Sequence, residues 1–318
     1  MASRNLKAKL NSVKNIGQIT KAMELVAATK MRKAQEVALR ARPYAKYALS
    51  LLRSLLLLEG GEELRAQSHF FNPSTRPERS RGARSGQERV CLVVVTSDRG
   101  LCGGFNSQVL RAALRFREQY PDSCVVAIGK KGKEFFERRG IPVLKSFSDF
   151  SEIVTLADVA PVAEFLLEEY GQHRHDTIAF CSTQFVSALF QKVELYRVLP
   201  VTLGELEKTI QGIVPKSGKY SDVQNGKERP EPVVSLLEPG AKALFEGLAE
   251  DLVRVEILHL IFESNASEHS SRMLAMKNAT DNAEDLQEEL QLLLNKARQG
   301  AITQELSEIA SAKEALSV

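Results

Sequence analysis

The two ends of this chain are almost free of residues that break helices. No proline occurs from Met1 to Arg42 or after Pro239, and these stretches contain only four glycines. A helix over residues 242–316 would be roughly 110 Å long at about 1.5 Å per residue, which is too long for an ordinary compact domain. We therefore expect the two ends to pair as a long antiparallel coiled coil that projects from a smaller globular body.

Small and apolar residues recur every seven positions along the N-terminal stretch, as they do at the seam of a coiled coil. The two interleaved series are Leu6, Val13, Thr20, Ala27, Ala34, Ala41, Ala48 and Leu55, and Leu10, Gly17, Glu24, Met31, Ala38, Ala45 and Leu52. A second stripe on a neighbouring face consists of Ile16, Ile19, Met23 and Val26. Alanine in the seam predicts that two helices approach closely, and the second stripe predicts a further partner. Pro43 predicts a kink or a short break near Arg42.

The C-terminal stretch has an apolar stripe of its own, in steps of three, four or seven residues. Its members are Ala266, Met273, Met276, Ala283, Leu286, Leu290, Leu293 and Ala297, and, after a slip of one residue, Ile302, Leu306, Ile309 and Leu316. Gly300 lies at the slip and predicts a local change in winding or in partner. The local net charge is +10 over residues 1–53 and −5 over residues 281–318. Opposite charge at the two ends favours their pairing.

Between the helical ends, apolar runs alternate with helical patterns. Strands are expected at residues 90–96, 125–128, 141–144, 177–181 and 193–199. Helices are expected at 106–120, with Asn106 as the cap, and at 131–139 and 156–170. This alternation predicts a fold of the α/β class, with a central Rossmann-like domain built on a mostly parallel five-stranded sheet.

These patterns also predict the domain organisation. An N-terminal coiled-coil helix would occupy residues 1–58, the α/β domain 90–200 and a C-terminal coiled-coil helix 239–318. Polar segments with several glycines and prolines would join them, as a mobile arginine-rich loop at 59–89 and a loop and connection at 201–238.

Composition argues against several classes of function. A net charge of +3 does not indicate a nucleic-acid-binding protein. No apolar run approaches the roughly 20 residues of a membrane-spanning helix, and the basic, periodic first residues do not resemble a signal peptide. The four cysteines are predicted to be buried free thiols in a cytosolic protein. His173 and His175 are predicted to be surface residues, because no cysteine or carboxylate cluster lies near them in the sequence, and no metal site is expected.

The segment Thr96 to Asn106, with the sequence TSDRGLCGGFN, follows the first strand, where Rossmann-like sheets bind phosphate. Its glycine spacing matches neither the dinucleotide fingerprint nor the P-loop, so a tight structural turn is favoured. A nucleotide-binding α/β enzyme with a coiled-coil oligomerisation arm stays open as an alternative function. The basic helix around Lys21, Lys30 and Lys33 also leaves open a scaffold on nucleic acid or membrane, although no aromatic side chain precedes Tyr44 to stack on bases.

Four segments, in order along the chain, resemble sequence blocks of the gamma subunit of F-type ATP synthases. They are GQITKAMELVAATKMRK at 17–33, SDRGLCGGFN at 97–106, ESNASE with the residues up to ATDN at 263–282, and NKARQ followed by ITQEL at 295–306. The resemblance implies the central rotating shaft, which couples ion flow through a membrane rotor ring to ATP synthesis or hydrolysis at the catalytic subunits. It implies no catalytic site and no cofactor in this subunit.

The resemblance also implies partners and contact residues. The shaft would stand inside a hexamer of catalytic and non-catalytic subunits, and the α/β domain would bind the epsilon subunit and the rotor ring, at the cytoplasmic face of the bacterial inner membrane. No contact with nucleic acid is implied. The residues implied are Arg298, Gln299 and Thr303 for a catch loop of a catalytic subunit, Lys21, Met23, Lys30 and Lys33 for the bearing, and Glu238 for the rotor ring. Ser235 and Leu237 replace tyrosines of some relatives, which weakens the rotor-ring contact. Because no cysteine follows Cys181, the regulatory thiol pair of plant-plastid relatives is not expected.

Overall fold

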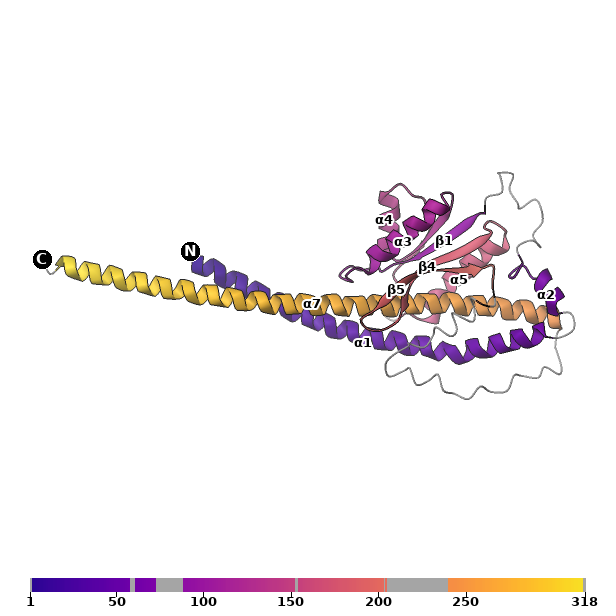
Figure 1. The fold of residues 1–318 in the computed structure, drawn as a ribbon, viewed down its shortest axis with the longest axis horizontal. Coiled ribbons are helices and arrows are strands. Elements are labelled where there is room, and N and C mark those ends of the chain that lie inside the picture. Colours follow the sequence, from indigo (N-terminus) through magenta and orange to yellow (C-terminus); the bar gives the residue numbers. More distant parts are fainter. Residues whose placement is uncertain are drawn as a thin grey trace. The chain divides into compact units, whose positions relative to one another are not determined.

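The computed structural model describes residues 2–57, 61–72, 88–151, 154–202, 204 and 240–316 (Figure 1). Glu238, predicted to contact the rotor ring, lies outside the described residues, as do most of the two predicted loops. The chain divides into two compact units, Met1–Ala27 with Arg272–Val318 and Ala28–Ser271. Each long terminal helix contributes to both units.

The predicted helical ends are confirmed as α1 (Ala2–Leu56) and α7 (Ala241–Leu316). The α1 helix continues through Pro43 and α7 continues through Gly300, so neither position breaks its helix. Most of the predicted seam of α1 is buried, namely Thr20, Ala27, Met31, Ala34, Ala38, Ala48, Leu52 and Leu55. On α7 the buried members are Ala266, Met276, Ala283 and Leu290. The stripe is exposed at Leu286 and Leu293 and, beyond Gly300, at Ile302, Leu306 and Ile309, so it is not a continuous buried seam.

The α/β domain contains five strands, as predicted. They are β1 (Val90–Val95), β2 (Cys124–Ile128), β3 (Val143–Phe147), β4 (Thr177–Phe185) and β5 (Gln191–Leu199). Their order in the sheet is β3-β2-β1-β4-β5, with all neighbours parallel except β4 and β5, which form an antiparallel hairpin. Every residue of β1 is buried, because this continuous apolar run lies in the middle of the sheet.

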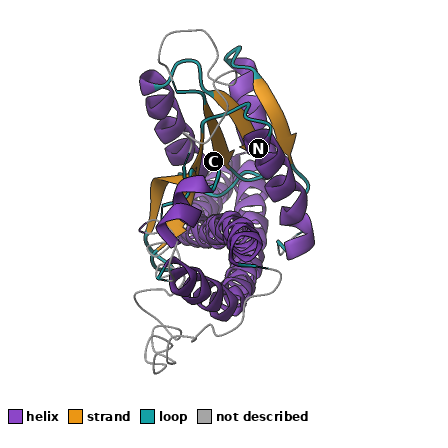
Figure 2. Ribbon diagram, turned by 90° about the vertical axis from the view of Figure 1, so that its right-hand side faces the viewer, coloured by secondary structure: helices purple, strands orange, loops and turns teal. Residues whose placement is uncertain are grey.

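Helices cover both faces of this sheet (Figures 1 and 2). On one face, α3 (Phe105–Gln119) and α4 (Lys130–Arg138) pack on Val90, Leu92 and Val94. On the other face, α5 (Leu156–Gly171) and parts of α1 and α7 share a core with Val93 and Val95. Alternate side chains of one strand thus enter two different cores, as the pleat of a strand requires.

Two further predictions about the fold are wrong. The predicted loop 59–89 contains a short helix, α2 (Gly61–Gln67), followed by the buried Ser68 and Phe70. Asn106 is not the cap of α3, because the helix begins at Phe105 and Asn106 lies in its first turn. Among the described residues, no helix combines the length and the apolar character needed to span a lipid bilayer.

Candidate functional site

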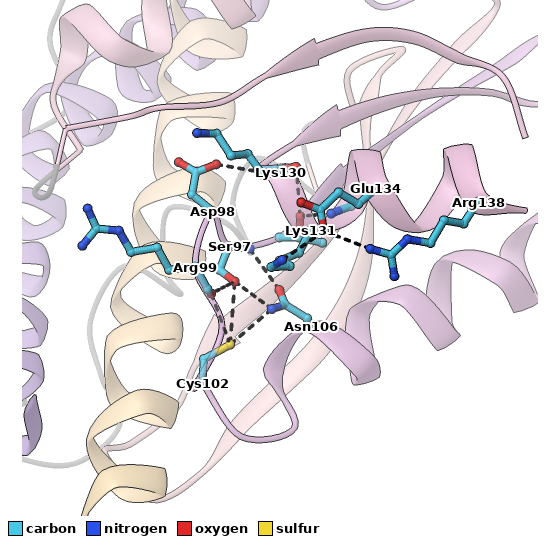
Figure 3. A network of polar contacts seen from close by, with 12 residues as sticks. Ser97, Asp98, Arg99, Cys102, Asn106, Lys130, Lys131, Glu134 and Arg138 are labelled. Carbon is cyan, nitrogen blue, oxygen red and sulfur yellow. Dashed lines mark hydrogen bonds and ion pairs between the residues drawn. The ribbon is translucent and has the colours of Figure 1, made fainter. Parts of the chain in front are cut away.

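The turn after β1 is closed by its own hydrogen bonds (Figure 3). The Ser97 backbone N–H donates to Asn106 Oδ1 at 3.0 Å, and Asn106 Nδ2 donates to Ser97 Oγ at 2.7 Å. The Ser97 hydroxyl in turn donates to the Arg99 carbonyl at 2.6 Å, and Asn106 Nδ2 also lies 3.2 Å from Cys102 Sγ. Asn106 therefore fixes the turn from within α3.

The same turn occupies the start of α4, where a Rossmann-like domain could receive an anion. The first three N–H groups of α4, from Lys130 to Gly132, donate to Asp98 Oδ1, the Ser97 carbonyl and Thr96 Oγ1 at 2.9, 3.1 and 2.8 Å. A negative side chain is favoured at a helix N-terminus for the same reason as a phosphate. The Asp98 carboxylate therefore takes the place that a phosphate would need at this helix.

A glycine is required where the chain enters α4. Gly129 has a φ of +91°, and a Cβ there would lie 2.2 Å from the carbonyl oxygen of Thr96. Gly129 thus lets the end of β2 pass directly against the end of β1. Together with the hydrogen bonds to Asp98, this close approach indicates a structural turn.

In the unit formed by residues 2–27 and 272–316, α1 and α7 lie side by side in opposite directions. Thr20 Oγ1 and Thr280 Oγ1 are hydrogen-bonded at 2.8 Å, and both hydroxyls also meet a carbonyl of their own helix. One turn away, a Cβ on Gly17 would lie 3.4 Å from Ala283 Cβ, an ordinary van der Waals distance. Small residues in the seam thus allow the close approach that the sequence predicts.

The outer faces of this helical pair expose large apolar side chains. The second stripe of α1 is exposed at Ile16, Ile19 and Val26, with Leu25 beside it. On α7 the exposed apolar residues are Leu286, Leu292, Leu293, Ile302, Leu306 and Ile309. Exposed apolar surface of this extent is typical of an interaction site rather than of a free surface.

The predicted contact residues fall in two groups. Lys21 lies on the exposed side of α1, and its Nζ donates a hydrogen bond to Glu24 Oε2 at 3.0 Å. This bond and the negative charges of Glu24, Glu284 and Asp281 raise the pKa of Lys21. Met23 is half-buried beside it. Lys30 and Lys33 are half-buried and exposed, respectively, and belong to the unit 28–271.

The second group lies on α7, beyond its contact with α1 at Thr280. Arg298, Gln299 and Thr303 are exposed, and the Thr303 hydroxyl donates to the Gln299 carbonyl at 3.0 Å. Because Arg298 follows Thr280 by 18 residues, it lies roughly 27 Å further along the helix axis. The structure therefore brings the three predicted catch residues together but keeps them apart from Lys21 and Met23.

Comparison with known proteins decides the family. The sequence model of the ATP synthase family (ATP-synt) matches residues 2–316. The ATP synthase gamma chain of Pelotomaculum thermopropionicum is 36% identical over 314 residues, with 98% of each chain covered. That of Herpetosiphon aurantiacus is also 36% identical, over 324 residues and 99% of each chain. The chain belongs to the ATP synthase gamma-chain family.

Solved structures support the same fold for this gamma-chain family member. A chain of the Euglena gracilis mitochondrial ATP synthase (OSCP/F1/c-ring) superposes with a TM-score of 0.63 at 18% identity, covering 99% of this chain and 94% of that one. A chain of the Tetrahymena thermophila mitochondrial ATP synthase (central stalk/c-ring) gives 0.53 at 21% identity, covering 82% and 99%. The resemblance noted in the sequence is thus confirmed.

One gamma-chain segment has a role that the sequence did not reveal. Within the unit 28–271, small hydroxyl residues of the segment 263–271 bind the β4–β5 hairpin. Ser267 donates to the Thr183 carbonyl at 3.3 Å, and Ser270 donates to the Ala188 carbonyl at 2.6 Å and accepts from Gln191 at 3.1 Å. The sequence feature that could have indicated this contact is the run of small polar residues within the helix. Their small side chains let the β4–β5 connection pack against α7.

The same face of α7 buries two ionisable groups. His259 Nε2 lies 3.5 Å from Glu263 Oε1, and both side chains are almost completely buried. Burial lowers the pKa of His259 to about 3 and raises the pKa of Glu263 well above its usual value. Both groups are therefore neutral over a wide range of pH.

The prediction that His175 is a surface residue is wrong. Its side chain is 13% exposed, and Nε2 lies 3.6 Å from Cys124 Sγ and 3.4 Å from Glu169 Oε2. A cysteine and a carboxylate do lie near it, although they are distant in the sequence. The four cysteines are free thiols, as predicted, and Cys91, Cys102 and Cys181 are buried, but Cys124 is only half-buried, so the prediction of burial is wrong there. A hydrogen bond with Cys91 and the neighbouring His175 lower the pKa of Cys124 to about 6.

Proposed function

We propose that this chain is the central rotating shaft of an F-type ATP synthase, coupling ion flow through the membrane rotor ring to ATP synthesis or hydrolysis. The observation that carries the proposal is the pair of antiparallel helices with exposed apolar outer faces, in a chain of the gamma-chain family. A long helical pair with apolar side chains on its outside needs a protein sleeve to cover them.

The shaft acts through its asymmetry. A pair of different helices presents different side chains in each direction, so three identical catalytic subunits around it meet three different surfaces. The subunits then differ in nucleotide affinity because each contacts a different face, and rotation exchanges these affinities in sequence. The chain itself is non-catalytic in this proposal and needs no cofactor. The turn after β1 supports this role, since it is closed by its own hydrogen bonds and its Asp98 carboxylate accepts from the first N–H group of α4.

Two sets of side chains would transmit the torque. Arg298, Gln299 and Thr303 would bind a catch loop of one catalytic subunit, because they are exposed together on α7 and offer charged and amide donors. Each charge-assisted hydrogen bond contributes about 1.5–3 kcal/mol. The bearing residues are Lys21, Met23, Lys30 and Lys33, whose positive charge suits acidic segments of the surrounding subunits.

The partners proposed are the catalytic and non-catalytic subunits, the epsilon subunit and the membrane rotor ring, which Glu238 would approach. The complex would lie at the cytoplasmic face of a bacterial inner membrane, with this chain as a peripheral component. The bacterial relatives support this placement. Two of the structural neighbours come from mitochondrial ATP synthase assemblies that include a c-ring.

The composition of the native complex tests the function. Purification of the endogenous chain should recover the catalytic and non-catalytic subunits in threefold excess over it, as a shaft inside a hexamer requires. The alternative enzyme would purify as a homo-oligomer and bind ATP or NAD at micromolar concentration in calorimetric titration. Recovery without ATP synthase subunits, together with such binding, would overturn the proposal.

A further inference from the structure

A cluster of chemically reactive side chains lies at the edge of the sheet opposite the turn after β1. Cys91 is the second residue of β1 and Cys124 the first residue of β2, and the two are direct partners in the parallel register. His175 precedes β4, and its ring contacts the Cys124 thiol. One ligand atom from each of these three residues lies within 4.8 Å of the others. Residues from three separate segments thus converge on one point.

The distances suit a tetrahedral metal ion. Zn²⁺ binds sulfur at about 2.3 Å and histidine nitrogen at about 2.0–2.1 Å, so a tetrahedral ion sets its sulfur and nitrogen ligands roughly 3.6 Å apart. The two ring nitrogens of His175 lie 3.6 Å (Nε2) and 3.9 Å (Nδ1) from Cys124 Sγ. The Cys124 thiol and the imidazole are therefore already close to the separation of two zinc ligands, and Cys91 Sγ, within 4.8 Å of both, needs to move by up to about 1 Å.

A buried carboxylate holds the histidine in place. Glu169 of α5 is buried, and its Oε2 lies 3.4 Å from His175 Nε2, while Oε1 accepts a hydrogen bond from Arg174. When Nε2–H donates to Glu169, Nδ1 is the nitrogen that would bind an ion, and it lies 3.9 Å from Cys124 Sγ. Metal-binding histidines are oriented by carboxylates in this way. Because Arg174 engages the other oxygen, Glu169 is a positioning residue rather than a ligand.

Packing alone does not account for this arrangement. Buried cysteines usually behave as small apolar side chains, and Cys181, on the other face of the sheet, does so among apolar neighbours. Cys91 and Cys124 also contact an apolar core, but unlike Cys181 they lie near a histidine that a buried carboxylate orients. The 13% exposure of His175 gives an ion a route from solvent.

We propose that Cys91, Cys124 and His175 bind a Zn²⁺ ion, with Glu169 orienting His175 and water filling the fourth position. The ion binds both sulfurs as thiolates, so any proton still on a thiol goes to solvent, and the two thiolates neutralise the charge of the ion. The ion joins β1, β2 and the α5–β4 turn, and so stabilises the α/β domain.

Titration of untagged, fully reduced, full-length protein tests the site. One equivalent of Zn²⁺ should bind, and Co²⁺ in its place should show the thiolate charge-transfer and visible bands of a tetrahedral site. Cys124→Ser and His175→Asn should each weaken binding about 100-fold or more, and Glu169→Gln about 10–100-fold. The matched control Cys181→Ser should bind like the wild type.

Three results would overturn the proposal. The first is no stoichiometric binding by folded wild-type protein. The second is equal affinity for Zn²⁺ in wild type, Cys124→Ser and His175→Asn, which would show that the ion binds at another site. The third is a Cys91–Cys124 disulfide in the purified protein, detected by peptide mass spectrometry, that persists under conditions that keep Cys102 and Cys181 reduced. Since His175 is partly exposed, His175→Asn keeps the test available if a cysteine variant does not fold.

Discussion

Gly17 lies in the seam between α1 and α7, and two substitutions there should have opposite effects on stability. A Cβ at this position would lie 3.4 Å from Ala283 Cβ, so alanine fits without displacing α7. Removing a glycine from the interior of a helix contributes roughly 0.5–1 kcal/mol. Leucine would push further atoms against α7, and overpacking of this kind typically costs about 1–3 kcal/mol. Gly17→Ala should therefore stabilise the helical pair, and Gly17→Leu should destabilise it.

Amide hydrogen exchange of the full chain measures this locally. In Gly17→Ala, a gain of about 1 kcal/mol in the free energy of local unfolding should slow amide exchange in peptides around residue 17 about fivefold. In Gly17→Leu, exchange in the same peptides should be faster by a similar factor or more. Gly300 is the matched control, because it lies on α7 and a Cβ added there would have no atom within 4 Å. Gly300→Leu should leave peptides around residue 17 unchanged. Equal protection in Gly17→Leu and Gly17→Ala would refute the close contact at Ala283.

Three further outcomes are expected. Replacing Arg298 and Gln299 with alanine should lower ATP hydrolysis by the assembled complex while the circular dichroism of the isolated chain stays the same, and normal turnover would exclude the catch contact. Glu263→Gln should stabilise the protein above about pH 5. The reason is that the raised pKa of Glu263 keeps it protonated in the folded state, whereas the unfolded chain gains stability by ionising it as pH rises past about 4.3. Denaturant titration at pH 4 should show no such gain, and a gain at pH 4 equal to that at pH 7 would contradict this reasoning. Ala34→Leu, in the buried seam, should lower the free energy of unfolding by about 1–3 kcal/mol in denaturant titration, whereas Arg32→Leu, on the exposed side, should change it little, and equal effects would mean that the seam is misplaced.

The sequence predicted the long helices and the sheet because their signals are local. A heptad of small residues fixes which side of α1 is buried, since helix geometry carries the pattern from one turn to the next. The continuous apolar run of β1 likewise identifies a central strand. On α7 the period alone did not distinguish seam from outer face, and Leu286 and Leu293 proved to be exposed. Both faces of that segment carry apolar side chains, so the spacing of apolar residues is compatible with burial of either face.

The remaining differences arise from contacts between distant residues. His175 meets Cys124 only because the parallel order of β2, β1 and β4 brings the amino ends of these strands together. The sequence did not predict helix α2, because the segment that contains it is polar. Phe70, which follows α2, is buried only because other parts of the chain form the core around it. Asparagine is a residue type favoured at helix N-caps, yet the side-chain amide of Asn106 is hydrogen-bonded to Ser97 across the turn. Such contacts need the tertiary fold.

Direct observation of rotation tests the central claim. A bead attached at Glu118→Cys, on the exposed surface of α3, would report motion of this chain inside an immobilised complex of its catalytic and non-catalytic subunits. During ATP hydrolysis the bead should turn in one direction, in steps of a third of a turn that match three catalytic sites. ATP hydrolysis by the same single complexes with a stationary bead would contradict the assignment of this chain as the rotating shaft.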